Sequence, residues 1–245
     1  MIELKIKLLA TDIDGTLTAD RSSNIIPVEA IEFMRKLESH GVHVSLVSAN
    51  ALPVIAGLKR YLGLKGPIIA ENGALIFINE SYESLTKYSA RDILEEVLSK
   101  LGNYVEDSWQ NDFRLHDYAL KVRTEYSSRA RYVFKLVKEY VESRYEWVRV
   151  TFSGYAIHLT PADVDKGKAL RYVMKKLNLK REEVVAIGDS LVDVDLIKEA
   201  GIGVAVSNAD EELKKVADLV LQNPSYKGFI ELAKMIINNE LNSLR

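Results

Sequence analysis

Cysteine is absent from all 245 residues of the sequence. Disulfides, thiolate metal sites and cysteine nucleophiles are therefore excluded, and the absence fits a reducing compartment. No stretch of about 18 residues stays uncharged and apolar, which argues against a membrane-spanning helix. The N-terminal Met-Ile-Glu-Leu-Lys-Ile-Lys alternates charged and apolar residues, unlike the continuous apolar stretch of a signal peptide. We therefore expect a cytoplasmic protein that does not enter a membrane.

An excess of charge of one sign is also missing, because the formal net charge at pH 7 is only −2. This balance gives no bulk attraction to nucleic acid or to an anionic membrane. Hydrophobic residues at 47% and charged residues at 28% are ordinary for a globular protein, and the length allows one domain with a large insertion or two domains. The four histidines have no metal-ligand spacing, and Gly201-Ile-Gly203 lacks the third glycine of a dinucleotide site.

Helical and strand patterns alternate in the first and last thirds of the chain. Apolar spacing and stop signals predict helices at 27–40, 52–62, 168–177 and 193–200, and strands at 7–10, 42–47, 67–70, 184–187, 203–206 and 219–221. Alternation of this kind is typical of a parallel sheet. We therefore predict an α/β fold with a Rossmann-like parallel-sheet core formed by residues 1–81 and 155–245.

The composition changes between residues 82 and 154. Two amphipathic helices, at 90–101 and 128–143, are predicted between strand-like segments at 119–124 and 147–152. From 119 to 149 there are eight Lys or Arg against four Glu. We expect this insert to be a separate α+β domain with a mildly cationic surface.

Four separated polar pieces fall at the carboxyl end of a predicted strand or the amino end of a helix. They are Asp12-Ile-Asp14-Gly15-Thr16, Ser48-Ala49-Asn50, Lys166, and Gly188-Asp189-Ser190-Leu-Val-Asp193. Open α/β sheets place their sites at these positions, so the pieces should converge in space. Taken alone, the aspartates could be helix caps or turn residues. A lysine in the first turn of a helix opposes the macrodipole, so local helix energetics would not select Lys166.

Taken together and in this order, the four pieces resemble the motifs of the haloacid dehalogenase-like phosphohydrolases. The flanking Glu71-Asn72-Gly73-Ala74 and Asn208-Ala209 are similar to those of the subclass whose α/β cap, the C2 type, lies between the second and third motifs. Within that subclass, the Ser-Ala-Asn form at 48–50 and the chain length most resemble the archaeal-type phosphoglycolate phosphatases. The resemblance implies a phosphatase that hydrolyses a small phosphorylated metabolite, with residues 82–154 as the cap that selects it.

The resemblance also implies a role for each motif residue. Asp12 would attack phosphorus to form an aspartyl phosphate, and Asp14 would protonate the leaving group and later deprotonate water. Lys166 would stabilise charge on the phosphoryl oxygens, and Mg²⁺ would offset the repulsion between the clustered aspartates. The implied magnesium ligands are Asp12, the main-chain carbonyl of Asp14, Asp189 and Asp193. The implied substrate-binding residues are Thr16, Ser48, Ala49, Asn50, Lys166 and Asn208.

Other functions stay open at this point. A sugar phosphatase or a phosphomutase would use the same motifs, and a receiver-type signalling domain also combines acidic residues, Mg²⁺ and a lysine on a parallel sheet. Receivers are about half this length and have no large insert, and a non-catalytic binding protein is disfavoured because every catalytic position is filled. In the cap, Arg114, Lys121 and Arg123 are the candidates to contact an anionic group of the substrate. The sequence does not determine whether the chain forms a homodimer.

Overall fold

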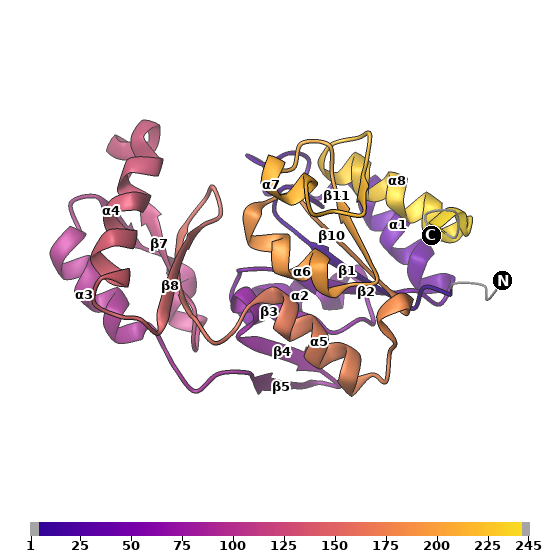
Figure 1. Cartoon of the computed structure of the whole chain (residues 1–245), viewed down its shortest axis with the longest axis horizontal. Helices are drawn as coiled ribbons and strands as arrows, with labels where there is room; N and C mark the ends of the chain where they lie inside the picture. Colours follow the sequence, from indigo (N-terminus) through magenta and orange to yellow (C-terminus); the bar gives the residue numbers. More distant parts are fainter. Residues whose placement is uncertain (1–4, 242–245) are drawn as a thin grey trace.

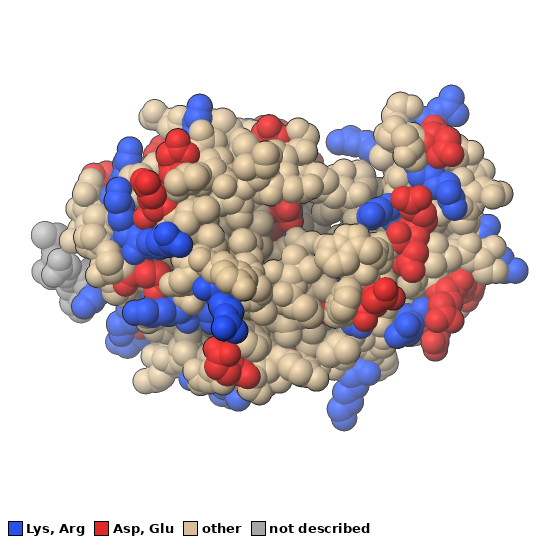
Figure 2. Space-filling view, turned by 180° about the vertical axis from the view of Figure 1, so that it is seen from behind, with Lys and Arg blue, Asp and Glu red and all other residues tan. Residues whose placement is uncertain are grey.

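The computed structural model describes residues 5–241; residues 1–4 and 242–245, which the sequence assigns to the core, lie outside this range. Two bodies are visible in Figure 1: the larger contains an eight-stranded sheet, and the smaller contains a four-stranded sheet. Each body has its own cluster of buried hydrophobic residues. Seen from behind, the surface is indented between the two bodies (Figure 2). Within residues 5–241, no helix is long and apolar enough to cross a membrane.

The larger sheet has the strand order β12-β11-β10-β1-β2-β3-β4-β5. All neighbouring strands are parallel except for β4 and β5, which add an antiparallel hairpin at one edge. The central strand β1 is buried along its whole length, as its apolar sequence predicts. The strands are β1 (Leu8–Asp12), β2 (His43–Val47), β3 (Ile68–Ala70), β4 (Leu75–Ile78), β5 (Ser81–Ser84), β10 (Val184–Gly188), β11 (Ile202–Ala205) and β12 (Leu219–Val220).

Helices cover both faces of this sheet. In Figure 1, α5 and α6 pack together in front of the sheet, and α1 and α8 pack together behind it. The helices of the larger body are α1 (Val28–Ser39), α2 (Leu52–Leu62), α5 (Lys166–Lys176), α6 (Val194–Glu199), α7 (Glu211–Lys214) and α8 (Ser225–Ile237). Short 3-10 turns are η1 (Glu71–Gly73), η4 (Arg181–Glu183) and η5 (Leu191–Asp193).

The smaller body is an antiparallel sheet with two helices. Its strand order is β6-β7-β9-β8. Val133, Val137 and Val141 recur every four residues along α4, so they lie on one face of the helix, and all three are buried. Its elements are α3 (Arg91–Leu101), β6 (Val105–Asp107), η2 (Trp109–Phe113), β7 (Tyr118–Val122), η3 (Thr124–Arg129), α4 (Ala130–Glu142), β8 (Val148–Phe152) and β9 (Ile157–Pro161).

The predicted fold class, a Rossmann-like parallel-sheet core with an inserted α+β cap, is confirmed. The sequence did not reveal the hairpin β4–β5, the strands β6 and β9, or the helices α7 and α8. Strand β9 carries His158 and Thr160 among its five residues, so it lacks a run of apolar side chains, although all five are buried. It pairs with β7 and β8 beyond residue 154, where the cap was expected to end. The domain boundaries stay a prediction.

Candidate active site

The first acidic motif lies in a tight loop at the carboxyl end of β1. Asp12 is the last residue of this strand, and the loop is closed by a hydrogen bond from the Gly15 N–H to Thr18 Oγ1 of 2.8 Å. Gly15 has a φ of +94°, and a Cβ there would lie 2.4 Å from a carboxylate oxygen of Asp189. The glycine of the motif is therefore required both by the backbone conformation and by the close approach of Asp189.

Lys166 joins the first motif to the last. It is the first residue of α5, whose amino end is capped by Asp165 through a hydrogen bond from the Lys168 N–H. Its Nζ lies 2.7 Å from Asp12 Oδ1 and 2.6 Å from Asp193 Oδ1, and all three side chains are buried. Burial by itself would lower the pKa of Lys166, but the two carboxylates raise it above its ordinary value. The lysine is therefore charged, and it holds two carboxylates together.

Asp193 and Asp189 have different surroundings at the carboxyl end of β10. Asp193 Oδ2 accepts hydrogen bonds from the N–H groups of Asp189 and Ser190 and from the Ser190 hydroxyl, so three donors hold this oxygen in place. Asp189 is paired with Arg21 through a contact of 2.6 Å and accepts a hydrogen bond from Thr16 Oγ1 at 3.3 Å. Arg21 comes from the loop after the first motif and is not among the site residues predicted from the sequence.

Three carboxylates form a group that fits a metal ion. One oxygen each of Asp12, Asp189 and Asp193 lies within 4.8 Å of the others, and all three residues are buried. Burial and the neighbouring carboxylates raise the pKa values of Asp12 and Asp189 well above their ordinary range, even with Lys166 and Arg21 present. A hard cation bound by oxygen ligands would relieve this excess of negative charge.

Asp14 lies beside this group on the cavity side. Burial raises the pKa of its carboxyl group, and Lys166 and a hydrogen bond from Asn50 lower it in part. The Asn50 Nδ2 group donates to Asp14 Oδ2 at 3.0 Å and to Ser48 Oγ at 2.9 Å. The Ser-Ala-Asn motif after β2 therefore lies in contact with the first acidic motif, as expected for pieces at neighbouring strand ends.

A buried polar network connects this region to the cap. Asp117, which is fully buried, lies 2.7 Å from Arg114 Nη1 and 2.9 Å from His158 Nδ1. Asn72 and Thr160 donate hydrogen bonds to its second oxygen. Next to it, the buried carboxylate of Glu71 accepts the N–H groups of residues 115, 116 and 117. Because Glu71 and Asn72 belong to the core, this network fixes one end of the cap sheet to the core.

A cavity of about 430 Å³ opens above Asp12, Asp14 and Lys166. The core contributes Ala49 and Asn50 to its wall. The cap lines it with Glu106, Ser108, Trp109, Gln110, Arg114, Lys121, Tyr155 and His158. Its size suits a small ligand held between the acidic motif and the cap.

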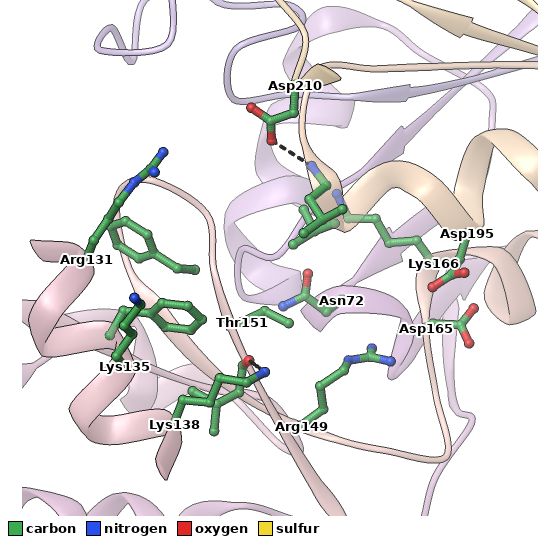
Figure 3. A pocket seen from close by; sticks show the side chains of 15 residues that line it. Asn72, Arg131, Lys135, Lys138, Arg149, Thr151, Asp165, Lys166, Asp195 and Asp210 are labelled. Atoms are coloured by element: carbon green, nitrogen blue, oxygen red, sulfur yellow. Dashed lines mark hydrogen bonds between the residues drawn. The ribbon is translucent and has the colours of Figure 1, made fainter. Parts of the chain in front are cut away.

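A second cavity, of about 530 Å³, also lies between the cap and the core (Figure 3). On its cap side α4 contributes Arg131, Lys135 and Lys138, and β8 contributes Arg149. The core side carries Asp165, Asp195 and Asp210. The facing surfaces of the two bodies are therefore mainly of opposite charge at this cavity, although the buried Lys166 also lines its core side.

The structure brings most of the predicted site residues together, but not all of them. Asp12, Asp14, Ala49, Asn50 and Lys166 line the first cavity. Thr16, Ser48, Asp189 and Asp193 contact these residues or one another through hydrogen bonds. Asn208 instead exchanges hydrogen bonds with Ser225 at the start of α8 and does not line the cavity.

The three basic candidates of the cap have different positions. Arg114 is buried, and its guanidinium binds Asp117 and the Ala49 carbonyl. Arg123 donates to the Gly102 carbonyl and does not line the cavity. Lys121 lines the cavity, and its side chain makes no hydrogen bond or ion pair with any residue between 5 and 241.

Several residues around the cavity belong to no motif in the sequence. Gln110, Tyr155 and His158 come from a 3-10 turn, a hairpin loop and a strand that had not been predicted. Arg21 lies seven residues after Asp14, and this closeness in sequence is the signal that could have drawn attention to it, although its partners Asp189 and Asp210 are far away in the chain.

Comparison with known proteins gives a consistent result. The family described as haloacid dehalogenase-like hydrolase matches this chain over residues 9–117 and 102–232. A phosphoglycolate phosphatase of Staphylothermus marinus is 53% identical over 95% of this chain and 98% of its own, and one of Metallosphaera sedula is 40% identical over 95% and 100%. The crystal structure of a Thermoplasma acidophilum protein superposes with a TM-score of 0.80 and 28% identity, covering 95% of this chain and 99% of its own. The chain belongs to the haloacid dehalogenase-like hydrolase family.

Proposed function

We propose that this protein is a phosphatase that hydrolyses 2-phosphoglycolate, a small phosphate monoester, through an aspartyl phosphate on Asp12. The observation that carries the proposal is the contact of Lys166 with both Asp12 and Asp193 at the floor of the cavity, with Asp14 beside them. The relatives named phosphoglycolate phosphatase, which match almost the whole chain, support the choice of substrate.

The reaction needs two displacements at phosphorus. In the first, a carboxylate oxygen of Asp12 forms a bond to phosphorus while the ester P–O bond breaks, and the leaving oxygen takes a proton from Asp14. In the second, water attacks phosphorus, Asp14 takes the proton of the water, and the bond to Asp12 breaks to release phosphate. The raised pKa of Asp14 suits this exchange, because a group that holds its proton longer is a better acid near neutral pH.

Other residues of the chain would bind and orient the phosphoryl group. Lys166 would contact its oxygens from the floor of the cavity, and the Ser48 hydroxyl can donate to it because its acceptor positions are used by the N–H and Nδ2 groups of Asn50. Asp12, Asp189 and Asp193, with the main-chain carbonyl of Asp14, would hold a divalent metal ion, for which we propose Mg²⁺. When bound, the ion would offset negative charge on the phosphoryl group.

We further propose that residues 82–154 act as the specificity cap and that Lys121 binds the carboxylate of phosphoglycolate. Lys121 is the cap cation that lines the cavity without a partner in the described part of the chain, whereas Arg114 is already bound to Asp117. Because the phosphoryl group is common to all monoesters, selection must come from contacts of this kind.

The experiment compares kcat/KM for phosphoglycolate and p-nitrophenyl phosphate in the wild type, Lys121→Ala and Lys135→Ala. Lys135 is a matched control, because it lines the second cavity and not the first. Lys121→Ala should lower the value for phosphoglycolate selectively, by about tenfold or more, which corresponds to about 1.4 kcal/mol. Equal losses for both substrates would remove Lys121 from the proposal. The release of one inorganic phosphate per substrate consumed distinguishes a phosphatase from a phosphomutase. A higher kcat/KM for a sugar phosphate than for phosphoglycolate would identify the protein as a sugar phosphatase instead.

A further inference from the structure

We propose that Gln110 of the cap is a positioning residue that orients the active-site amide of Asn50, so that it donates to Asp14 and Ser48. This inference rests on the proposed function, because it takes Asp14 as the group that exchanges protons. Gln110 lies in the turn η2, in a different body from Asn50, yet the two amide groups are in direct contact. Neither the motifs nor the hydrophobic pattern of the sequence assigns a role to this glutamine.

The orientation of the Gln110 amide follows from two neighbouring groups that can only donate hydrogen bonds. The backbone N–H of Ala51 lies 2.8 Å from Gln110 Oε1, and an N–H cannot accept. The guanidinium of Arg114, also a donor only, approaches the same oxygen at 3.5 Å. The oxygen of the Gln110 amide is therefore fixed on this side, and its Nε2 group must point the other way.

The orientation of the Gln110 amide in turn determines the orientation of the Asn50 amide. Gln110 Nε2 donates to Asn50 Oδ1 at 2.8 Å. Because the oxygen of Asn50 is held there, its Nδ2 group faces Asp14 Oδ2 at 3.0 Å and Ser48 Oγ at 2.9 Å. An inverted Asn50 would instead place an acceptor against the Asp14 carboxylate, which is repulsive when Asp14 is ionised.

Two functional groups depend on this orientation. Asp14 receives a donor that fixes the direction of its carboxylate in the cavity. Ser48 Oγ accepts from Asn50 twice, through the backbone N–H and through Nδ2, so the hydroxyl proton is left to donate to a ligand. The cap therefore contributes to the core chemistry through Gln110, in addition to lining the cavity.

The test uses Gln110→Glu, which has the same shape and still accepts from Ala51 but cannot donate to Asn50. Asn50 should then invert and present its oxygen to Asp14. Proton donation by Asp14 is needed for an alkyl ester, whose leaving group is a strong base, and much less for p-nitrophenyl phosphate. We therefore expect kcat/KM to fall about tenfold or more for phosphoglycolate and less than threefold for p-nitrophenyl phosphate. The quantity kcat/KM reports the first displacement, in which the leaving group departs.

Two further variants complete the experiment. Asn24→Asp makes the same amide-to-carboxylate change in the same cavity, but Asn24 has no side-chain hydrogen bond within the described residues, so the alkyl-to-aryl ratio should stay at the wild-type value. Gln110→Met removes all three hydrogen bonds of the Gln110 side chain without adding charge. It should lower the same ratio, and it takes the place of Gln110→Glu if that variant does not fold.

Each outcome decides the proposal. A selective loss for the alkyl ester in the Gln110 variants and not in Asn24→Asp supports it. Equal losses for both substrates, as a merely structural role would give, or no loss at all would overturn it. If the wild-type enzyme hydrolyses neither ester, the proposed function fails instead, and this result is separate from any effect at Gln110.

Discussion

Replacing Asp117 with asparagine should strongly destabilise the protein, although this residue is not one of the family motifs. The side chain of Asp117 is fully buried and accepts hydrogen bonds from four side chains, those of Arg114, His158, Thr160 and Asn72. Arg114 is only 2% exposed, so its charge is buried with no other carboxylate in direct contact among the described residues. Removing one partner of a buried ion pair costs about 3–5 kcal/mol. Because asparagine keeps one acceptor oxygen for Arg114, we expect Asp117→Asn to lower the free energy of unfolding by about 3 kcal/mol, the lower end of this range.

The pH dependence of this loss identifies its cause. Burial by itself would raise the pKa of Asp117, but the charges and hydrogen bonds of His158 and Arg114 lower it below its ordinary value. A carboxyl group whose pKa is lower in the folded state stabilises the protein above the unfolded pKa, which is about 3.9. That stabilisation is lost as the pH falls through the folded pKa. The difference between wild type and Asp117→Asn should therefore still be present at pH 5 and should be lost only below about pH 4.

Urea unfolding at a series of pH values measures this difference. Asp112→Asn is the control, because Asp112 is exposed in the same part of the cap and makes no side-chain contact that the structure records between residues 5 and 241. Its effect should stay within about 0.5 kcal/mol. A loss below about 1 kcal/mol for Asp117→Asn at pH 7 would refute the reasoning, and so would a loss that disappears by pH 6.

Three shorter predictions concern the cavity. Asp12→Asn should reduce kcat to below about a hundredth of the wild-type value, because an amide cannot act as the nucleophile. It should not lower the free energy of unfolding, because burial and nearby carboxylates already raise the pKa of Asp12 and make its ionised form costly. A stable but active variant would contradict the covalent mechanism. Mg²⁺ should support turnover and Ca²⁺ should inhibit it, since Ca²⁺ takes more ligands at longer distances, and full activity after exhaustive chelation would contradict this. Burial and nearby carboxylates raise the pKa of Tyr155 to about 12, so a difference titration against Tyr155→Phe, followed by tyrosinate absorbance, should show no ionisation of this residue below pH 10.

The structure narrows the list of cap residues that could select the substrate. Arg114, Lys121 and Arg123 were equivalent candidates in the sequence, because each is a cation in the insert. Only the packing of the cap distinguishes them: Arg114 is buried against Asp117, Arg123 is turned to the Gly102 carbonyl, and Lys121 lines the cavity. The substrate and the roles of these residues stay predictions that the kinetic experiments test.

The sequence alone determined the fold class and the acidic centre, because both depend on local patterns. Alternating strands and helices predict a parallel sheet, and such a sheet brings the residues that follow its strands to one edge. Asp12, Asp14, Lys166, Asp189 and Asp193 could therefore be grouped without knowing any distance.

Tertiary structure alone decided which side chains from the cap meet that centre. The contacts of Gln110 with Asn50 and of Asp117 with Asn72 join residues far apart in the chain, and they depend on how the small sheet packs against the core. A glutamine in a short turn or a histidine in a strand has no periodic pattern that reveals its partner. Such contacts arise only when two separately formed bodies pack together, so the orientation of the Asn50 amide, and with it the surroundings of Asp14, was not predictable from the sequence.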